Sequence, residues 1–286
     1  MTIFHILILA IIQGAAELLP VSSSAHVIMA EKLLGLDPTR PEMTLLLVML
    51  HTGTMFAVIC FYWKAWKASF FQSGRESAAF LKLLALATVL TGAVGLGLKF
   101  VIEKVFLKAT PKAEIEMIFG NLTLISASLA VVGCLIIYSG LKTQRSSRRG
   151  GDMDVRGAFW MGAIQGLCLP FRGFSRSGAT ISTGMILGLS RKQVEEFSFA
   201  LAVVLTPPII AREVLRLVKA QHAEGAGSFG IGLFAPSLIG MALSFGAGLL
   251  ALRWLSSWLE KGRWHLVGIY CICASMVAFL LSWSGI

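Results

Sequence analysis

Two short polar stretches interrupt a chain that is otherwise strongly apolar, and both contain residue types that do chemistry. The first holds an amide, a carboxylate, a proline, three consecutive serines and a histidine: Gln13, Glu17, Pro20, Ser22, Ser23, Ser24 and His26. Ser23 and His26 are three residues apart, so on a helix they occupy neighbouring positions of one face. A serine beside a histidine can act as a nucleophile with its general base. The remaining histidines are interpreted as structural: His5, His51, His222 and His265.

The second polar stretch combines serines, glycines and two arginines: Arg172, Gly173, Ser175, Arg176, Ser177, Gly178 and Thr180. Serine favours the N-cap position of a helix, and an open helix N-terminus presents N–H groups and a positive dipole end to phosphate. Pro20 ends one helix just before the serine cluster, and Ser175 precedes an apolar piece at 178–189. We therefore expect each stretch to open a helix, and the two N-termini with both arginines to bind a highly charged anion such as a diphosphate.

The composition places these stretches in a membrane. Hydrophobic residues make up 56% of the 286 and charged residues 14%, with a mean hydropathy of +0.78, whereas a soluble domain carries about 25% charged residues. A helix that crosses a bilayer needs about 20 mostly apolar residues, and lipid forces the backbone to satisfy its own hydrogen bonds. We predict an all-α polytopic membrane protein with about six full spans, at 44–63, 79–101, 117–141, 196–218, 229–253 and 263–284.

The net charge of +10 does not indicate a nucleic-acid-binding protein, because many of the basic residues gather in three segments between the apolar stretches. These segments are 64–82, 142–156 and 253–263. The positive-inside rule assigns such loops to the cytoplasm, and anionic lipid headgroups are a sufficient partner for them. The expected partners are therefore membrane lipids and no nucleic acid.

An internal repeat divides the chain. AIIQG at 10–14 resembles GAIQG at 162–166, LLGL at 33–36 resembles ILGL at 186–189, and LVMLHT at 47–52 resembles LAVVLT at 201–206. The offsets are 152, 153 and 154 residues, and this steadiness is stronger evidence than any single patch, although apolar stretches can also resemble one another by chance. We predict one membrane domain, 1–286, built from a first half at about 1–141, a cytoplasmic basic loop at 142–156 and a second half at about 157–286.

Counting crossings from the basic loops makes the repeat an inverted one. Span 44–63 then runs inward and its repeat partner 196–218 runs outward, as in proteins with inverted-topology repeats. Residues 157–195 begin and end inside, so they are predicted to form a re-entrant helix hairpin, and 1–43 a matching hairpin from outside. Residues 3–19 are nearly long enough to span alone, which is the weakest part of this assignment.

A charged side chain at membrane depth is costly unless it is paired or hydrated. Glu17 and Arg176 would both lie at that depth, one in each hairpin. They are therefore functional candidates by default; the alternative is a structural pair that joins the two hairpins, which is also compatible with catalysis. The G-x-x-x-G patterns at Gly162/Gly166 and Gly184/Gly188 are interpreted as sites of close helix packing.

With these residues in place, the chain resembles the undecaprenyl-diphosphate phosphatase family, also known for bacitracin resistance. The first family signature, [E/Q]-x-x-x-E followed by P-V-S-S-[ST]-x-H, is matched by the residues from Gln13 to His26. The second, P-G-x-S-R-S-G-A-T, is matched from Gly173 to Thr180. Length, span order and inverted halves are also similar over the whole chain.

The resemblance implies a membrane phosphoanhydride hydrolase of the bacterial inner membrane, with its site open to the periplasm. It would convert undecaprenyl diphosphate to undecaprenyl phosphate and phosphate, and so recycle the lipid carrier of peptidoglycan synthesis. It also implies a homodimer and a divalent cation, Mg²⁺ or Ca²⁺. The chain departs from the signature at Arg172, which replaces the usual proline, and Gln13 removes one carboxylate that could hold the metal.

The mechanism expected from these motifs assigns each residue a role. Glu17, Ser23, His26 and Arg176 are the candidate catalytic residues, with Ser23 attacking the terminal phosphorus and His26 as its base; attack by His26 itself or by a metal-bound water stays open. Glu17 and Gln13 would hold the metal. The expected substrate-binding residues are Ser22, Ser24, Arg172, Gly173, Ser175, Ser177, Gly178 and Thr180.

Three other functions are compatible with parts of this sequence. An inverted-repeat transporter or flippase has the same architecture, but few charged residues lie within the spans to relay ions. The other large class of membrane lipid phosphatases carries S-R-x₅-H, whereas Ser182 stands six residues after Arg176 here. A purely structural membrane protein would need neither polar stretch.

Overall fold

The computed structural model describes residues 2–38, 40–106, 115–144, 150–223, 231–259 and 263–285. These residues form helices, apart from their connections and one isolated β-bridge between Gly151 and Leu189. Six of the helices are long and apolar enough to cross a membrane, which confirms the predicted fold class. They are α3 (Pro41–Phe70), α4 (Gly74–Val101), α5 (Leu122–Gln144), α8 (Arg191–Ala223), α9 (Ile231–Leu259) and α10 (Trp264–Trp283).

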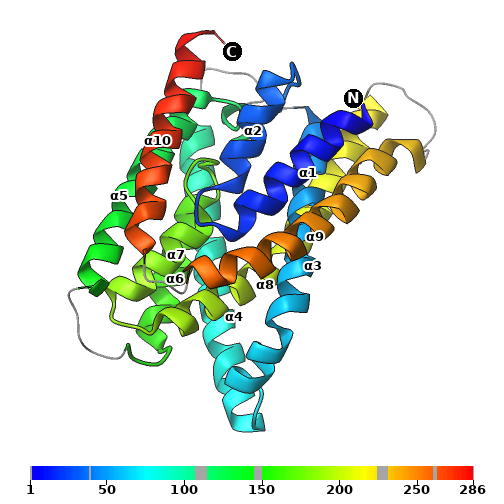
Figure 1. Cartoon of the computed structure of the whole chain (residues 1–286). Helices are drawn as coiled ribbons and strands as arrows, with labels where there is room; N and C mark the ends of the chain where they lie inside the picture. Colours follow the sequence, from blue (N-terminus) through cyan, green and yellow to red (C-terminus); the bar gives the residue numbers. More distant parts are fainter. Residues whose placement is uncertain are drawn as a thin grey trace.

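Four shorter helices form the two hairpins that carry the polar stretches. They are α1 (Ile3–Leu18), α2 (Ser23–Leu33), α6 (Val155–Cys168) and α7 (Arg176–Ile186). A helix rises 1.5 Å per residue, so the 16 residues of α1 extend about 24 Å, short of the roughly 30 Å hydrocarbon core. The sequence at 3–19 therefore turns back instead of spanning, and α1 and α2 return towards the same end of the molecule (Figure 1).

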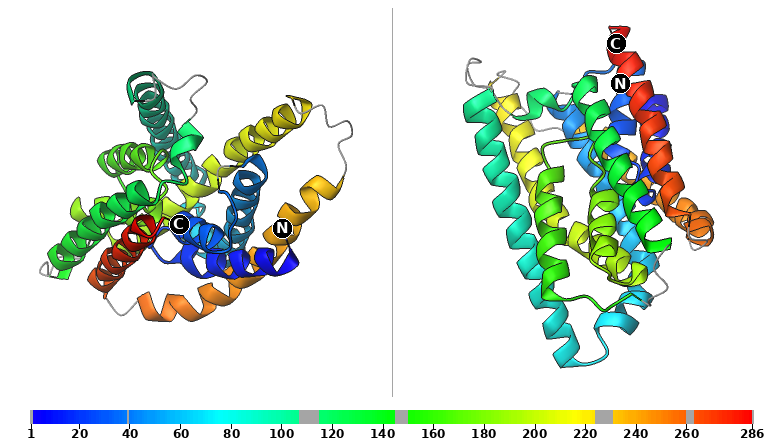
Figure 2. Two further views of the ribbon diagram at one scale, coloured as in Figure 1. Left: turned by 90° about the horizontal axis from the view of Figure 1, so that it is seen from above. Right: turned by 90° about the vertical axis from the view of Figure 1, so that its left-hand side faces the viewer.

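The helices repeat in order, and the second set runs opposite to the first. Figure 1 shows α3 descending from the end where the N-terminus lies, whereas α8 ascends towards that end. The hairpins pack across the halves, α1 against α9 and α6 against α4. The partners α5 and α10 pack on each other, and lie side by side in both views of Figure 2. The exact boundaries of the two halves stay predictions.

Glycines let the hairpins approach the spans closely. A Cβ at Gly162 would lie 2.5 Å from the Ala87 carbonyl oxygen of α4, and a Cβ at Gly166 would lie 2.6 Å from Val94 Cβ. The predicted packing role of this pair is therefore confirmed. Gly188 is different, because its φ of +87° ends the turn after α7 and no side chain approaches it within 4 Å. The packing role predicted for that residue was wrong.

Candidate active site

The two polar loops meet in the interior of the molecule. Ser22 Oγ donates a 2.6 Å hydrogen bond to the carbonyl oxygen of Arg172, and a Cβ at Gly178 would lie 2.9 Å from the carbonyl oxygen of Pro20. The predicted helix starts are also present. Ser22 caps α2 and Ser175 caps α7, each accepting a bond from the backbone N–H three residues ahead. Two helix N-termini therefore open at one place.

Ser22 has an unusual backbone. Its φ is +65°, and it is the one residue other than glycine with positive φ in the part of the chain that the structure describes. A side chain in this left-handed region is strained, and such strain persists where surrounding contacts over-determine it. Here the contact is the hydrogen bond from Ser22 Oγ to the Arg172 carbonyl oxygen. The loop between α6 and α7 therefore holds the loop between α1 and α2 in a strained backbone conformation.

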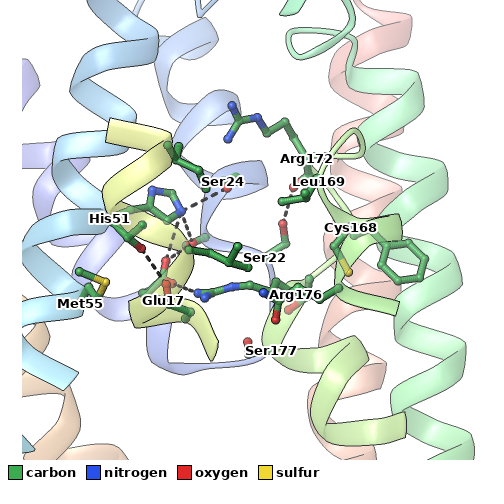
Figure 3. A pocket seen from close by; sticks show the side chains of 18 of the residues that line it. Glu17, Ser22, Ser24, His51, Met55, Cys168, Leu169, Arg172, Arg176 and Ser177 are labelled. Carbon is green, nitrogen blue, oxygen red and sulfur yellow. Dashed lines mark hydrogen bonds and ion pairs between the residues drawn. The ribbon is translucent and has the colours of Figure 1, made fainter. Parts of the chain in front are cut away.

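Glu17 lies at the centre of the site, 9% exposed. Arg176 Nη2 donates to its Oε1 at 2.7 Å, which confirms the expected pairing of the two hairpins. Ser23 Oγ donates to Oε2 at 2.5 Å, and Gln13 Nε2 donates to the same oxygen at 2.7 Å. The carboxylate therefore joins residues of both halves and orients the Ser23 hydroxyl (Figure 3).

The histidine that contacts the serines is His51 of α3, which the sequence predicted to be structural. Its Nε2 lies 3.3 Å from the hydroxyls of Ser23 and Ser24 and 3.3 Å from Glu17 Oε2. Its Nδ1 lies 2.8 Å from the Leu47 carbonyl oxygen, which can only accept, so Nδ1 carries a proton. In the neutral ring Nε2 is then the lone-pair atom, and it is turned towards the serines.

His26 does not form the expected pair with Ser23. Its Nδ1 lies 2.8 Å from the Ser22 carbonyl oxygen, and its Nε2 lies 2.8 Å from the hydroxyl of Tyr270. The two rings also stack, with centroids 5.6 Å apart. Helical spacing brings neighbouring residues to one face, but the side-chain direction turned this ring towards α10. The prediction of a Ser23–His26 pair was wrong for this reason.

A cavity of about 160 Å³ opens over Glu17 and the serines. Its polar lining includes Ser22, Ser23, Ser24, Ser175, Arg176 and Ser177. Much of its apolar lining comes from two spans. Helix α3 contributes Val48, Met55 and Val58, and α8 contributes Phe199, Ala202, Leu205 and Ile209. We call this apolar part of the lining the α3–α8 groove. The cavity therefore suits a ligand with an anionic head and an apolar tail.

Three of the expected substrate-binding residues do not line this cavity. Gly173 packs against α5, where a Cβ would lie 2.1 Å from the Ile125 carbonyl oxygen. Gly178 lies against the other loop, and Thr180 is fully buried with its hydroxyl 2.6 Å from Ser198 Oγ. Arg172 lines the cavity, but its guanidinium lies over the Phe119 ring, 4.0 Å from the centroid, and points away from Arg176 (Figure 3). Gly173, Gly178 and Thr180 therefore contribute to the packing of the loops and do not line the cavity.

The residues present do not make a resident metal site. Among the described residues no three His, Cys, Asp or Glu side chains cluster closely enough to hold an ion. Both Glu17 oxygens already accept hydrogen bonds from protein donors. Gln13 Oε1 is buried without a hydrogen-bond partner, so it is one oxygen that could still act as a metal ligand. Magnesium bound by few protein ligands takes further oxygens from substrate phosphates, so this set suits only an ion that arrives with its ligand.

Fold and site define a polytopic membrane protein with a buried cluster of serines, a carboxylate and an arginine in a partly apolar cavity. A family model described as bacitracin resistance protein BacA matches residues 6–277. The chain is 55% identical to undecaprenyl-diphosphatase 2 of Acinetobacter baylyi over 287 residues, 99% of each chain. It is 33% identical to undecaprenyl-diphosphatase 1 of Burkholderia pseudomallei over 295 residues, 99% of this chain and 97% of that one. The chain belongs to the BacA family of undecaprenyl-diphosphatases.

Proposed function

We propose that the protein hydrolyses undecaprenyl diphosphate to undecaprenyl phosphate and phosphate. This reaction recycles the lipid carrier of peptidoglycan synthesis and so confers resistance to bacitracin. The observation that carries the proposal is that the Glu17–Ser23–Arg176 cluster lines the same cavity as the α3–α8 groove. The groove takes the prenyl chain, and the arginine and helix N-termini take the diphosphate.

Each side chain has a role in the reaction. Arg176 and the N–H groups that open α2 and α7 bind the phosphate oxygens and balance the charge that develops in the transition state. Ser23 Oγ attacks the terminal phosphorus, and its proton passes to Glu17 Oε2, which already accepts its hydrogen bond at 2.5 Å. The bond from that phosphorus to the bridging oxygen breaks, and undecaprenyl phosphate leaves. Water then hydrolyses the phosphoserine and restores the Ser23 hydroxyl.

His51 supports this step from the other side of the serine. Its Nε2 lies 3.3 Å from Ser23 Oγ, so the hydroxyl is confined between the ring and the carboxylate that accepts its proton. We assign the proton to Glu17 because its hydrogen bond is shorter, and we assign His51 to positioning of the hydroxyl. Rapid quenching with a phosphorus-labelled substrate tests the nucleophile. Label on Ser23 supports the serine route, and label on His26 or His51, or none on protein, rejects it.

We propose further that Mg²⁺ or Ca²⁺ reaches the site bound to the diphosphate. Gln13 Oε1 and Glu17 are the nearest protein oxygens to receive such an ion. When bound, the cation neutralises phosphate charge. Removing divalent ions with a chelator should then lower the rate of phosphate release in proportion to the concentration of the metal–substrate complex. A rate that persists in the presence of the chelator contradicts this proposal.

The resemblance also supports two placements that extend the proposal. The site faces the periplasm, since the α3–α4 turn, which carries basic residues of the segment 64–82, lies at the end of the molecule opposite to the N-terminus (Figure 1). The protein forms a homodimer. Cysteine labelling at loop positions in intact cells tests the first placement, and mass measurement in detergent tests the second.

Phosphate release from undecaprenyl diphosphate by the purified protein tests the main proposal. Glu17→Gln should lower the rate about 10²- to 10⁴-fold, as expected for a lost proton acceptor, and Arg176→Ala about 10²- to 10³-fold. Glu195→Gln is the matched control, because Arg191 and Glu195 form another 2.7 Å ion pair away from the cavity. Binding without phosphate release would instead favour a transporter.

A further inference from the structure

Gln165 of α6 is a buried amide that the protein leaves unsatisfied. Its side chain is 0% exposed, and neither Nε2 nor Oε1 has a hydrogen-bond partner among the described residues. Buried polar groups in folded proteins nearly always have partners, and one that lacks them destabilises the fold. An amide kept in this condition therefore calls for a partner that is not part of the chain.

The residue lies where such a partner would bind. Gln165 lines the same cavity as Glu17 and Arg176. Its orientation is fixed by the neighbouring glycines, because Gly162 and Gly166 lie directly against α4 and leave no room for rotation of α6. The backbone of Gln165 is therefore held beside the cavity by helix packing, and its side chain has no hydrogen bond within the described residues.

The corresponding residue of the first half shows why the Gln165 amide has no hydrogen-bond partner in the described chain. Gln165 occupies the position of Gln13 in the repeat, each followed by a glycine that packs on a span. Gln13 Nε2 donates to Glu17, four residues further along α1. The residue four further from Gln165 is Leu169, which offers no acceptor. The second half therefore has the glutamine of the first half but has leucine where the first half has its acceptor Glu17.

We propose that Gln165 is a substrate-binding residue, whose Nε2 donates a hydrogen bond to an oxygen of the diphosphate. This rests on the proposed function of the site. It adds a neutral donor from α6 to the arginine and the helix N-termini. A neutral donor binds a phosphate oxygen without adding another positive charge beside Arg176, and the ligand satisfies the amide that the folded chain does not.

Gln165→Met, which has nearly the same length and no polar group, separates this role from a structural one. The melting temperature in detergent should stay unchanged or rise, because the variant removes an unsatisfied buried amide. The kcat/KM for undecaprenyl diphosphate should fall about 10- to 100-fold, the range for a lost hydrogen bond to a charged group. Pyrophosphate should raise the melting temperature of the parent protein and raise that of the variant much less.

Two controls make the result specific. Leu167→Ala, on the same helix but exposed and outside the cavity, should leave activity and the pyrophosphate shift unchanged. Gln13→Met should lower the melting temperature, because that amide does have partners within the chain.

The outcomes are distinct for the two proposals. A Gln165→Met variant with the parent's kcat/KM and pyrophosphate shift overturns the inference while phosphate release by the parent still supports the proposed function. A clear loss of melting temperature in the variant also overturns it, because the amide would then have a structural partner. If the parent releases no phosphate but its pyrophosphate shift depends on Gln165, the residue binds diphosphate and the proposed function fails.

Discussion

Arg176 and Glu17 lie 159 residues apart in the sequence and 2.7 Å apart in the structure. Each comes from a different half, at the start of α7 and the end of α1. The carboxylate is almost fully buried, and the arginine side chain is 29% exposed towards the cavity. The pair therefore holds the two hairpins together and turns the outer face of the guanidinium towards a ligand.

Separating these two roles requires a double variant. Arg176→Met leaves the Glu17 charge without its cation, and losing one partner of a buried pair costs about 3 kcal/mol. Adding Glu17→Gln removes the stranded charge. We expect the melting temperature to fall in the single variant and to recover in large part in the double variant, while phosphate release stays abolished in both. Recovery of activity with stability would mean that the pair is only structural.

His51 and His26 should differ in their effect on turnover. We expect His51→Gln to lower kcat about 10- to 100-fold, less than the roughly 10²- to 10⁴-fold of a lost proton acceptor, because its Nε2 positions the Ser23 hydroxyl without taking its proton. His26→Gln should change kcat less than about 3-fold on the same scale, since that ring is turned to Tyr270. Steady-state measurement of kcat for the two variants tests this difference. A larger fall in kcat for His26→Gln than for His51→Gln would show that the His26 ring turns during the reaction.

The α3–α8 groove should determine the response to prenyl chain length. Leu205→Trp adds bulk within the groove, so we expect kcat/KM for the undecaprenyl substrate to fall about 10-fold or more and that for farnesyl diphosphate to change little. Val204→Trp is the control, because Val204 is next to Leu205 in the sequence but its side chain is exposed and does not line the cavity. Equal losses for both substrates would place the prenyl chain elsewhere.

The close approach of α6 to α4 makes a prediction about folding. Gly166→Val places carbon where Val94 Cβ would be 2.6 Å away, and such overpacking costs about 1–3 kcal/mol. Gly92→Ala in α4 is its counterpart, since nothing lies within 4 Å of a Cβ there. We expect a lower melting temperature for the first variant and an unchanged or higher one for the second. An unchanged melting temperature in Gly166→Val would contradict the packing role.

Local chemistry made much of the fold predictable. Long apolar runs in lipid have few alternatives to a helix, so all six predicted spans overlap the observed ones. The predicted boundaries of the helices were less exact than the predicted number of spans. Helix α5 begins at Leu122, five residues after the predicted start at 117, because Asn121 Oδ1 accepts the N–H of Leu124 and starts a new helix after the turn at 115–118.

The site was predictable where the motifs fix the backbone, and less so where side-chain direction decides. Helix-capping chemistry identified Ser22 and Ser175 correctly, and the cost of burial identified Glu17 and Arg176. His51 looked like a single polar residue in an apolar span, because nothing local shows that α3 passes beside the serines. The LVMLHT repeat patch was the one signal for it, since LAVVLT has leucine where His51 stands.

The separation of Glu17 from Arg176 also constrains how the protein is made. Ribosomes add about 5–20 residues per second, so the carboxylate is synthesised roughly 10 to 30 s before its counter-ion. During that interval the first hairpin lacks the cation that stabilises Glu17 at membrane depth. It must remain hydrated or in contact with the insertion machinery until α7 arrives. The first hairpin is therefore translated well before the second but reaches its final place only after the second is made.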